Sequence, residues 1–233
     1  MDQKYARQIL SEINKDYNAV AERFSRARPR MWPEMEFLFG KYINAGDKIL
    51  DLGCGNGRAY PFVSGKGAFY TGVDFSEKLL KIAREKYPEA DFQIGDALDL
   101  PLPDNSFSKI LSVSVLHHIP SRELRQKFLK ECRRILKPEG LLLLTAWNLW
   151  QNRRGRIKIL KGAISKALGK SPLDFKDIKA GWYGAEDCYI HCFTRRELER
   201  AIKGGGFRMI KSGTMKLKNK KSLSNFFIVA RRE

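Results

Sequence analysis

Apolar residues recur along this chain at two characteristic spacings. Between residues 4 and 24 they are three or four positions apart, which predicts an amphipathic helix along Tyr5, Ile9, Ile13, Tyr17, Val20 and Phe24. Beyond residue 45, short apolar runs alternate with helical patterns. The runs predict strands at 48–53, 68–74, 91–94, 108–115 and 141–146, with helices at 77–86 and 121–136. This alternation predicts an α/β fold with a doubly wound sheet.

Capping and breaking residues define several ends of these elements. Pro33 is placed to begin a second N-terminal helix, and Ser76 is placed to cap the helix at 77–86. The segment Thr194-Arg-Arg-Glu197 is a capping box that opens a last helix, up to Lys203. Three glycines at 204–206 end that helix before two final strands, at 207–212 and 223–231.

The pattern predicts one domain over residues 1–233. Residues 1–45 form an N-terminal helical cap, 46–147 a cofactor-binding core, and 191–233 a C-terminal helix with a strand pair. Residues 148–190 fit no step of the alternation and are interpreted as an insertion, basic in its first part. Because this insertion follows the fifth strand at the carboxyl edge of the sheet, we expect it to lie over the site and to serve the substrate.

The candidate chemistry lies where the first two strands end. Residues 49–57 read Ile-Leu-Asp-Leu-Gly-Cys-Gly-Asn-Gly, and the second strand ends at Asp74. Glycines 53 and 55 permit a tight turn and close approach of a ligand, and Asp74 is spaced to accept hydrogen bonds from both hydroxyls of a ribose. A carboxylate at Asp51 would repel a pyrophosphate, so it favours a cofactor with a cationic end, such as S-adenosylmethionine.

Charge and composition narrow the partners. Forty-four Lys and Arg against 26 Asp and Glu give a net charge of +18, which favours a polyanion such as nucleic acid, although a basic surface with no specific partner remains the alternative. No membrane-spanning run or signal peptide is evident, and four cysteines without a Cys-x-x-Cys pair favour a reducing cytoplasm. Cys188, His191 and Cys192 lack a fourth ligand, so no metal site is expected.

The segment Asp51-x-Gly-x-Gly-x-Gly57 resembles motif I of the class I methyltransferases, and the run 49–146 resembles their domain throughout. This resemblance implies a Rossmann-like seven-stranded sheet of order 3-2-1-4-5-7-6 with an antiparallel last strand. It also implies an acid at the adenine amino group, here Asp96. The cofactor residues it implies are Tyr17, Asp51, Gly53, Cys54, Gly55, Asp74, Phe75, Asp96, Ala97, Ser112 and His117.

A closer resemblance lies outside the cofactor motifs. The spacing Tyr17-Asn … Phe24-Ser-x-x-Arg28-x-x-x-Trp32-Pro is similar to the opening of the eukaryotic tRNA wobble-uridine carboxymethyl methyltransferases. Four later segments also match: Val-Leu-His-His at 115–118, Trp147, Arg-Arg-Gly at 153–155 and Tyr-Ile-His-Cys-Phe at 189–193. This resemblance implies a methyl ester formed on the carboxylate of a modified wobble uridine in tRNA.

That reaction needs no general base, because a carboxylate with a pKa of about 4 is already ionised. Arg28, His117 and Arg154 are candidates to position the substrate, and Arg28 is equally suited to the carboxylate of the cofactor's methionine end. The wider set of candidates for base stacking and phosphate contact is Trp32, Trp147, Trp182, Arg153, Arg154, Arg156 and Lys158. For each tryptophan, core packing is the alternative.

Two other functions stay open from the residues alone. One is a methyltransferase acting on a small quinone or lipid precursor, and the other is a basic RNA-binding protein with a non-catalytic cofactor site. The resemblance further implies a small zinc-binding activator that adds a strand to the third strand of the sheet. Because Asp91 and Asp96 flank that short strand, we expect activity without the activator.

Overall fold

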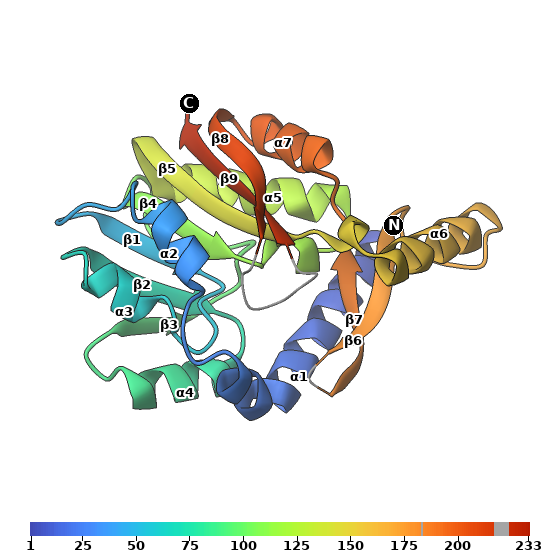
Figure 1. The fold of residues 1–233 in the computed structure, drawn as a ribbon, viewed down its shortest axis with the longest axis horizontal. Coiled ribbons are helices and arrows are strands. Elements are labelled where there is room, and N and C mark those ends of the chain that lie inside the picture. The colour runs from blue at the N-terminus through green and yellow to red at the C-terminus, as the bar shows by residue number, and fades with distance from the viewer. Residues whose placement is uncertain (183, 217–223) are drawn as a thin grey trace.

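The main sheet has the strand order predicted above. The computed structural model describes residues 1–182, 184–216 and 224–233, and its seven-stranded sheet runs β3-β2-β1-β4-β5-β9-β8 (Figure 1). Its strands are β1 (Lys48–Leu52), β2 (Phe69–Asp74), β3 (Asp91–Ile94), β4 (Phe107–Val113), β5 (Leu136–Trp147), β8 (Phe207–Lys216) and β9 (Ser224–Arg232). The pairs among β3, β2, β1, β4 and β5 are parallel, and β9 is antiparallel to both of its neighbours. The α/β fold and the order 3-2-1-4-5-7-6 are therefore confirmed.

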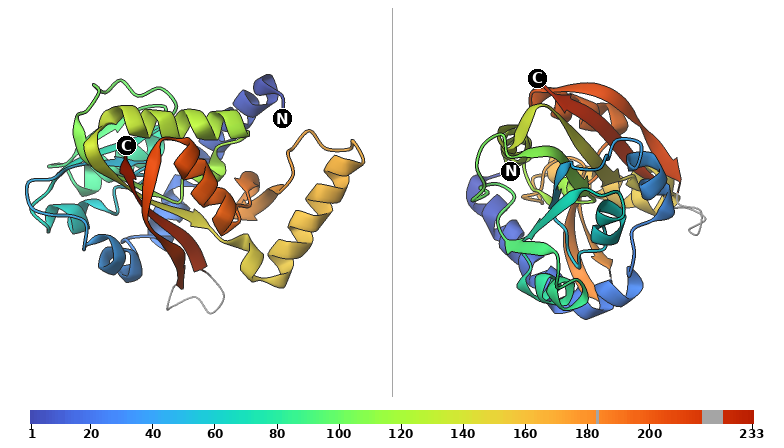
Figure 2. Two further views of the ribbon diagram at one scale, coloured as in Figure 1. Left: turned by 90° about the horizontal axis from the view of Figure 1, so that it is seen from above. Right: turned by 90° about the vertical axis from the view of Figure 1, so that its left-hand side faces the viewer.

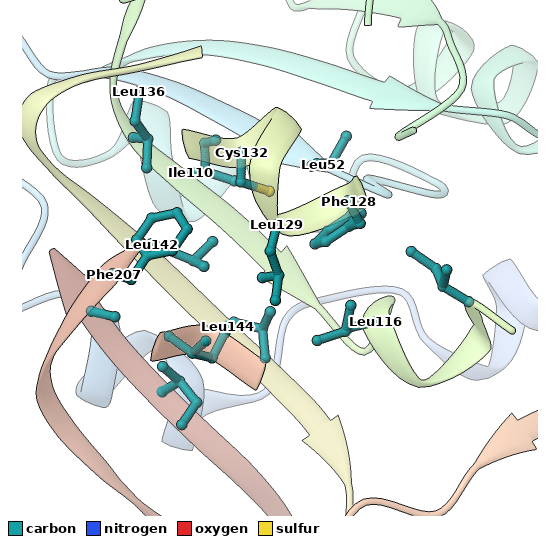
Figure 3. Close-up of a cluster of buried hydrophobic side chains, with 14 of the residues drawn as sticks. Leu52, Ile110, Leu116, Phe128, Leu129, Cys132, Leu136, Leu142, Leu144 and Phe207 are labelled. Carbon is teal, nitrogen blue, oxygen red and sulfur yellow. The ribbon is translucent and has the colours of Figure 1, made fainter. Parts of the chain in front are cut away.

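Helices cover both faces of this sheet (Figure 2). The α-helices of the described residues are α1 (Gln3–Ala27), α2 (Pro33–Phe39), α3 (Tyr60–Ser64), α4 (Glu77–Lys86), α5 (Arg122–Ile135), α6 (Arg153–Ala167) and α7 (Arg195–Gly204), of which α6 lies away from the sheet. On one face, Phe128 of α5 and Leu198 of α7 pack with Leu142 and Leu144 of β5, a cluster drawn in part in Figure 3. On the other face, α2, α3 and α4 bury Met35, Val63 and Leu80.

The predicted caps form as expected. Ser76 Oγ accepts from the backbone N–H of Leu79 at 3.3 Å, and Thr194 and Glu197 make both bonds of a capping box. The N-terminal helix is longer than its apolar pattern required, because Asp2 caps it at one end and it continues to Ala27 at the other. It packs on α4 and on β7 and so closes over the carboxyl ends of the strands.

The insertion has more regular structure than the sequence indicated. It contains a 3₁₀ turn (Leu149–Gln151), helix α6, and an antiparallel pair of strands, β6 (Asp177–Trp182) and β7 (Ala185–His191). The strand pair is held from two sides: Tyr189 packs with Ile9 and Ile13 of α1, while Ile178 packs with Ile159 of α6. Because these contacts join different segments of the chain, the local apolar pattern did not predict the strand pair.

The chain after β4 also departs from the expected strand. β4 ends at Val113, and Ser114 has a left-handed φ of 64° instead of continuing to residue 115. Its N–H donates to the carbonyl oxygen of Thr145 at 3.1 Å and also to the Thr145 hydroxyl, which fixes the turn on β5. A 3₁₀ turn at Leu116–His118 follows, and it determines which histidine faces the site.

Candidate functional site

A cavity lies at the carboxyl ends of β1, β2 and β4, covered by α1. It contains about 920 Å³ of empty space, a figure that includes solvent at its open side. Its walls come from α1, from the loops after β1, β2, β3 and β4, and from the end of β5. This is the position where open α/β sheets bind ligands.

The glycine-rich turn after β1 forms one wall. Gly53 has a φ of 78°, and a Cβ added there would come within 2.3 Å of the Val115 side chain, so the turn requires glycine. The N–H groups of Gly53 and Cys54 both donate to the carbonyl oxygen of Val73, at 2.8 and 3.1 Å. The turn therefore follows β2 closely and brings Gly53, Cys54 and Gly55 to the cavity.

Asp74 ends β2 inside the same cavity. Its carboxylate accepts from the N–H of Gly55 at 2.8 Å and from the N–H of Ser76 at 2.9 Å. Burial raises the pKa of this carboxyl, and the backbone hydrogen bonds partly offset that effect. The backbone thus holds the side chain in one orientation at the position suited to a ribose, with Phe75 beside it in the lining.

Asp51 lies behind the turn, outside the cavity lining. It is 3% exposed, and the Tyr70 hydroxyl donates to its carboxylate at 2.8 Å. Burial raises the pKa of Asp51 to about 7, although the Tyr70 hydrogen bond and the charge of Arg58 act in the opposite direction. Any effect of Asp51 on a cationic ligand would therefore act through the intervening turn, as a charge near the cavity.

The loop after β3 supplies the wall farthest from β5. Asp96 and Ala97 both line the cavity, and the Asp96 carboxylate accepts from the N–H of Leu98 at 2.9 Å. Asp96 is exposed, unlike Asp51 and Asp74. Its second oxygen is the one suited to an exocyclic amino group such as that of adenine.

The turn after β4 places different residues in the cavity from those chosen on sequence. Ser112 and His117 are fully buried and do not line it, whereas Ser114 and His118 do. Within the described residues, the Ser114 hydroxyl and both ring nitrogens of His117 have no hydrogen-bond partner. His117 instead stacks on Trp147, with ring centroids 4.7 Å apart. The adjacent histidine is therefore the better candidate for contact with a ligand.

His118 connects the helical cap to the insertion across the cavity. Its Nε2 lies 3.1 Å from the Tyr17 hydroxyl of α1, and its Nδ1 lies 3.0 Å from the carbonyl oxygen of Tyr189 in β7. Burial lowers the pKa of His118 to about 4, so the ring is neutral near pH 7. Tyr17 is half-buried, and desolvation raises the pKa of its hydroxyl above the ordinary value, so it remains a phenol.

Two arginines and two tryptophans from four segments of the chain meet at the cavity, and all but Trp32 line it. The Arg28 guanidinium lies 5.1 Å from the ring centroid of Trp32 and 5.9 Å from that of Trp147. Arg58 lies 5.0 Å from the Trp32 centroid, and both arginines line the cavity. Sequence reasoning missed Arg58, because the single residue that follows Gly57 carries no motif of its own.

The remaining candidates lie away from the lining. Arg153, Arg154, Arg156 and Lys158 are exposed on α6, which begins six residues after Trp147. The side chain of Trp182 falls outside the described part of the structure. No group of three potential metal-ligating side chains is found among the described residues, and His191 is held by Asp177 and Glu197 at 2.6 and 3.1 Å.

The residues present fit S-adenosylmethionine. The glycine turn leaves room that a Cβ would fill, Asp74 and Asp96 offer carboxylates at the ribose and adenine positions, and Ser114 presents an unpaired buried hydroxyl. Arg28 and Tyr17 also line the cavity and are the residues suited to the amino-acid part of such a cofactor. This donor set suits a nucleoside with a charged tail.

Comparison with known proteins identifies the family. Residues 50–144 match the model of a methyltransferase domain. A Schizosaccharomyces pombe protein named tRNA (carboxymethyluridine(34)-5-O)-methyltransferase is 30% identical over 225 residues, covering 91% of this chain and 94% of that protein. The chain belongs to this methyltransferase family. It is an enzyme that uses S-adenosylmethionine as the methyl donor.

Other relatives and structures agree with this assignment. A mouse protein named tRNA (carboxymethyluridine(34)-5-O)-methyltransferase ALKBH8 is 34% identical over 164 residues. The match covers 70% of this chain but 23% of the mouse protein, which is much longer. A SAM-dependent methyltransferase from Methanosarcina mazei superposes with a TM-score of 0.74 at 23% identity, over 87% of this chain and 98% of that one.

A further structural match is a complex. It joins the Haloferax volcanii Trm112 methyltransferase activator to a putative methyltransferase, with a TM-score of 0.69, 16% identity and coverage of 95% and 98%. At these identities the two structural matches show the fold. In the part of the methyltransferase that the structure describes, no helix is long and apolar enough to cross a membrane.

Proposed function

We propose that this methyltransferase esterifies the carboxylate of a 5-carboxymethyl-type uridine at the wobble position of tRNA. The observation that carries the proposal is the Arg28 cluster, in which a guanidinium that lines the cavity lies within 6 Å of the ring centroids of Trp32 and Trp147. A guanidinium binds a carboxylate in its own plane through two hydrogen bonds, and an indole stacks on an extruded base. The Schizosaccharomyces pombe relative, which the match covers to 94% of its length, carries this activity in its name.

The local structure explains how Arg28 is positioned. Arg28 caps the C-terminus of α1, and its carbonyl oxygen accepts from the Asn56 side chain at 3.1 Å, which ties it to the glycine turn. Trp32 caps α2 four residues later, and Trp147 ends β5. The substrate carboxylate and the cofactor pocket are therefore approached by residues of a single connected cluster.

The reaction requires the protein to position the substrate carboxylate against the methyl donor and requires no general base. S-adenosylmethionine, when bound, supplies a methyl group on a positively charged sulfur. The substrate carboxylate is ionised near neutral pH, so no residue has to remove a proton. Arg28 holds that carboxylate in orientation, the tryptophans exclude water and hold the base, and neutral His118 keeps Tyr17 in place at the cofactor side.

The deciding experiment detects the ester itself. Transfer RNA bearing 5-carboxymethyluridine is incubated with the enzyme and methyl-labelled cofactor, and its nucleosides are analysed by mass spectrometry. We expect a labelled nucleoside whose methyl group is released by mild alkali, as an ester requires. Label that survives alkali, or label found only on small molecules, would contradict the proposal.

Arg28→Lys tests the positioning role. Because lysine cannot form the planar paired contact, we expect turnover to fall on the order of 100-fold while cofactor affinity is retained. Arg30→Lys, two residues away and exposed, is the matched control. Loss of cofactor affinity in Arg28→Lys would assign this arginine to the cofactor's own carboxylate.

We further propose that the methyltransferase acts without an activator protein. β3 is the edge strand, as expected, but it has four residues and is flanked by Asp91 and Asp96, which limits strand addition. A charge of +18 also favours direct binding of tRNA. If the purified chain turns over only after a zinc-binding partner is added, this proposal is wrong, and the exposed side chains of Phe69 and Ile94 near that edge are the first contact to examine.

A further inference from the structure

Helix α6 exposes a continuous apolar stripe that the methyl transfer site does not use. Of the nine large apolar side chains exposed in the described residues, four lie on or directly after this helix: Ile157, Leu160, Ile164 and Leu168. Their side chains are between 43% and 62% exposed. The helix extends away from the main sheet, as Figure 2 shows, so no described element covers the stripe.

The opposite face of α6 is already packed. Ile159 is buried with Ile178 and Ile190 of the strand pair and with Cys192 directly after it, and Gly162 lies against the carbonyl oxygen of Asp177. The exposed aliphatic residues therefore lie on the face of α6 that this packing leaves open. An organised row of apolar side chains in contact with water is unfavourable, and such rows usually mark a site where another molecule binds.

The geometry of the stripe is narrow. At about 100° per residue, the four side chains fall within an arc of about 80°. Arg156 and Lys161 border that arc on its two sides, and Arg153 lies within it, one turn before Ile157. We call this stripe of Ile157, Leu160, Ile164 and Leu168 the seam. It is one or two side chains wide and has charges on its flanks, as do the surfaces along which two helices pack lengthwise.

The charge pattern selects the kind of partner. Residues 151–173 contain seven Lys or Arg and no Asp or Glu. A second copy of this chain would bring like charges together, and an RNA backbone offers no apolar surface for the aliphatic side chains. Helices that lie in a lipid interface generally present a broader apolar face with aromatic residues. Carboxylates on both flanks of an apolar helix would complement this seam.

We propose that α6 is a docking site for a helix of a partner protein, with an apolar seam flanked by Asp or Glu. The contact would place Ile157, Leu160, Ile164 and Leu168 against the partner's apolar row, and Arg156 and Lys161 against its carboxylates. None of these residues lines the cofactor cavity, and the contact shares only Arg156 with the residues expected to bind tRNA phosphates. A partner here would hold the enzyme in an assembly while leaving the cavity open.

A synthetic probe tests the seam. A labelled amphipathic peptide with leucines along one face and glutamates on both flanks is titrated with the full enzyme and followed by fluorescence anisotropy. A second peptide with lysines in place of the glutamates measures the charge requirement. We expect the acidic peptide to bind at least tenfold more tightly than the lysine peptide.

The variant that removes the seam carries Ile157→Gln, Leu160→Gln, Ile164→Gln and Leu168→Gln. All four sites are exposed, so we expect unchanged cofactor affinity and at least tenfold weaker binding of the acidic peptide. Phe37→Gln with Ile210→Gln removes apolar side chains of 73% and 41% exposure elsewhere and is the control. Equal binding of the acidic peptide by the seam variant and the parent, or no binding by either, overturns the proposal.

Two further measurements cover the other occupants. Sedimentation velocity reports whether the chain forms a dimer that the seam variant loses, and co-sedimentation with phosphatidylserine–phosphatidylcholine vesicles reports whether it binds lipid through the same residues. Either result would assign the seam to that occupant and overturn the proposal for a helical protein partner. Neither outcome bears on the ester assay, so the two proposals can fail separately.

Discussion

The Tyr17 hydroxyl lies 3.1 Å from Nε2 of His118 and so fastens the N-terminal helix to the turn after β4. The opposite nitrogen of this ring faces the carbonyl oxygen of Tyr189, which can only accept. Nδ1 therefore carries the hydrogen, and Nε2 accepts from Tyr17.

Tyr17→Phe should weaken both the closure and the site. The substitution leaves the buried Nε2 of His118 without its donor, which should cost about 1 to 3 kcal/mol of unfolding free energy. We expect a lower midpoint in thermal unfolding and weaker cofactor binding by calorimetry. Tyr5→Phe, in the same helix but outside the cavity, should change neither. If both variants behave alike, the hydrogen bond does not fasten the cap.

Asp74→Ala should reduce cofactor affinity strongly. Two hydrogen bonds from ribose hydroxyls to a carboxylate contribute roughly 1.5 kcal/mol each, so we expect a loss of about 2 to 3 kcal/mol by calorimetry. The variant also frees the N–H groups of Gly55 and Ser76, which Asp74 now holds. Asp74→Asn retains an acceptor for one of them and should lose less.

Asp99→Ala is the matched control for this test. Asp99 is an exposed acid three residues from Asp96 and does not line the cavity. Its removal should leave affinity unchanged. Full cofactor affinity in a correctly folded Asp74→Ala protein would remove Asp74 from the binding site.

Asp51 makes stability depend on pH in a specific direction. Its pKa in the folded protein is about 7, against an ordinary 3.8, because burial disfavours the charged form. The folded state then keeps a proton that the unfolded chain releases above about pH 4. Stability linked to this group is present below pH 4 and is lost as pH rises through 7, by up to roughly 4 kcal/mol.

Asp51→Asn should therefore change the free energy of unfolding in a more stabilising direction at pH 8 than at pH 4.5. The amide oxygen can still accept from Tyr70, so the packing is preserved. Denaturant unfolding at the two pH values measures the difference, with Asp99→Asn as the exposed control. An equal effect of Asp51→Asn at both pH values would mean that Asp51 is ionised in the folded state throughout. The variant should also weaken binding of a cationic cofactor.

The sequence predicted the elements whose signals are local. The third strand matches the structure at both ends, Asp91 and Ile94, and the caps at Ser76 and Thr194 form as predicted. Strand order followed from family resemblance, and the comparisons and topology agree with it. These features depend on apolar periodicity and on hydrogen bonds between near neighbours in the chain.

The rest depended on contacts between distant segments. Ser114 adopts a left-handed φ because Thr145 of the next strand binds its N–H, and this turn brings His118 to the cavity in place of His117. The strand pair β6–β7 packs against α1 and α6, which both precede it in sequence, α1 by about 150 residues. Arg58 joins the site through Trp32, 26 positions earlier in the chain. No pattern within one segment contains this information.

Binding of tRNA should depend steeply on salt through the first turns of α6. Arg153, Arg154, Arg156 and Lys158 are all exposed near the end of β5, where they can reach phosphates of a tRNA whose wobble base enters the cavity. Each phosphate contact releases counterions, so the slope of log affinity against log salt should fall by roughly 0.7 to 0.9 per contact removed. Changing all four to alanine should therefore flatten the slope by about 3.

A charge-matched variant separates this effect from the general field of a +18 protein. Lys41, Lys48, Lys66 and Lys137 are exposed near the amino ends of the strands, on the side away from the cavity. Their replacement by alanine removes the same charge, so a general field predicts equal losses in the two variants, whereas direct contact predicts a much larger loss for the α6 set. Filter binding of tRNA from about 50 to 200 mM salt covers the range in which such slopes are resolved. If the slopes of the two variants coincide, the basic residues of α6 are a solvated face, and the phosphate contacts must be sought nearer to Arg28 and Trp32.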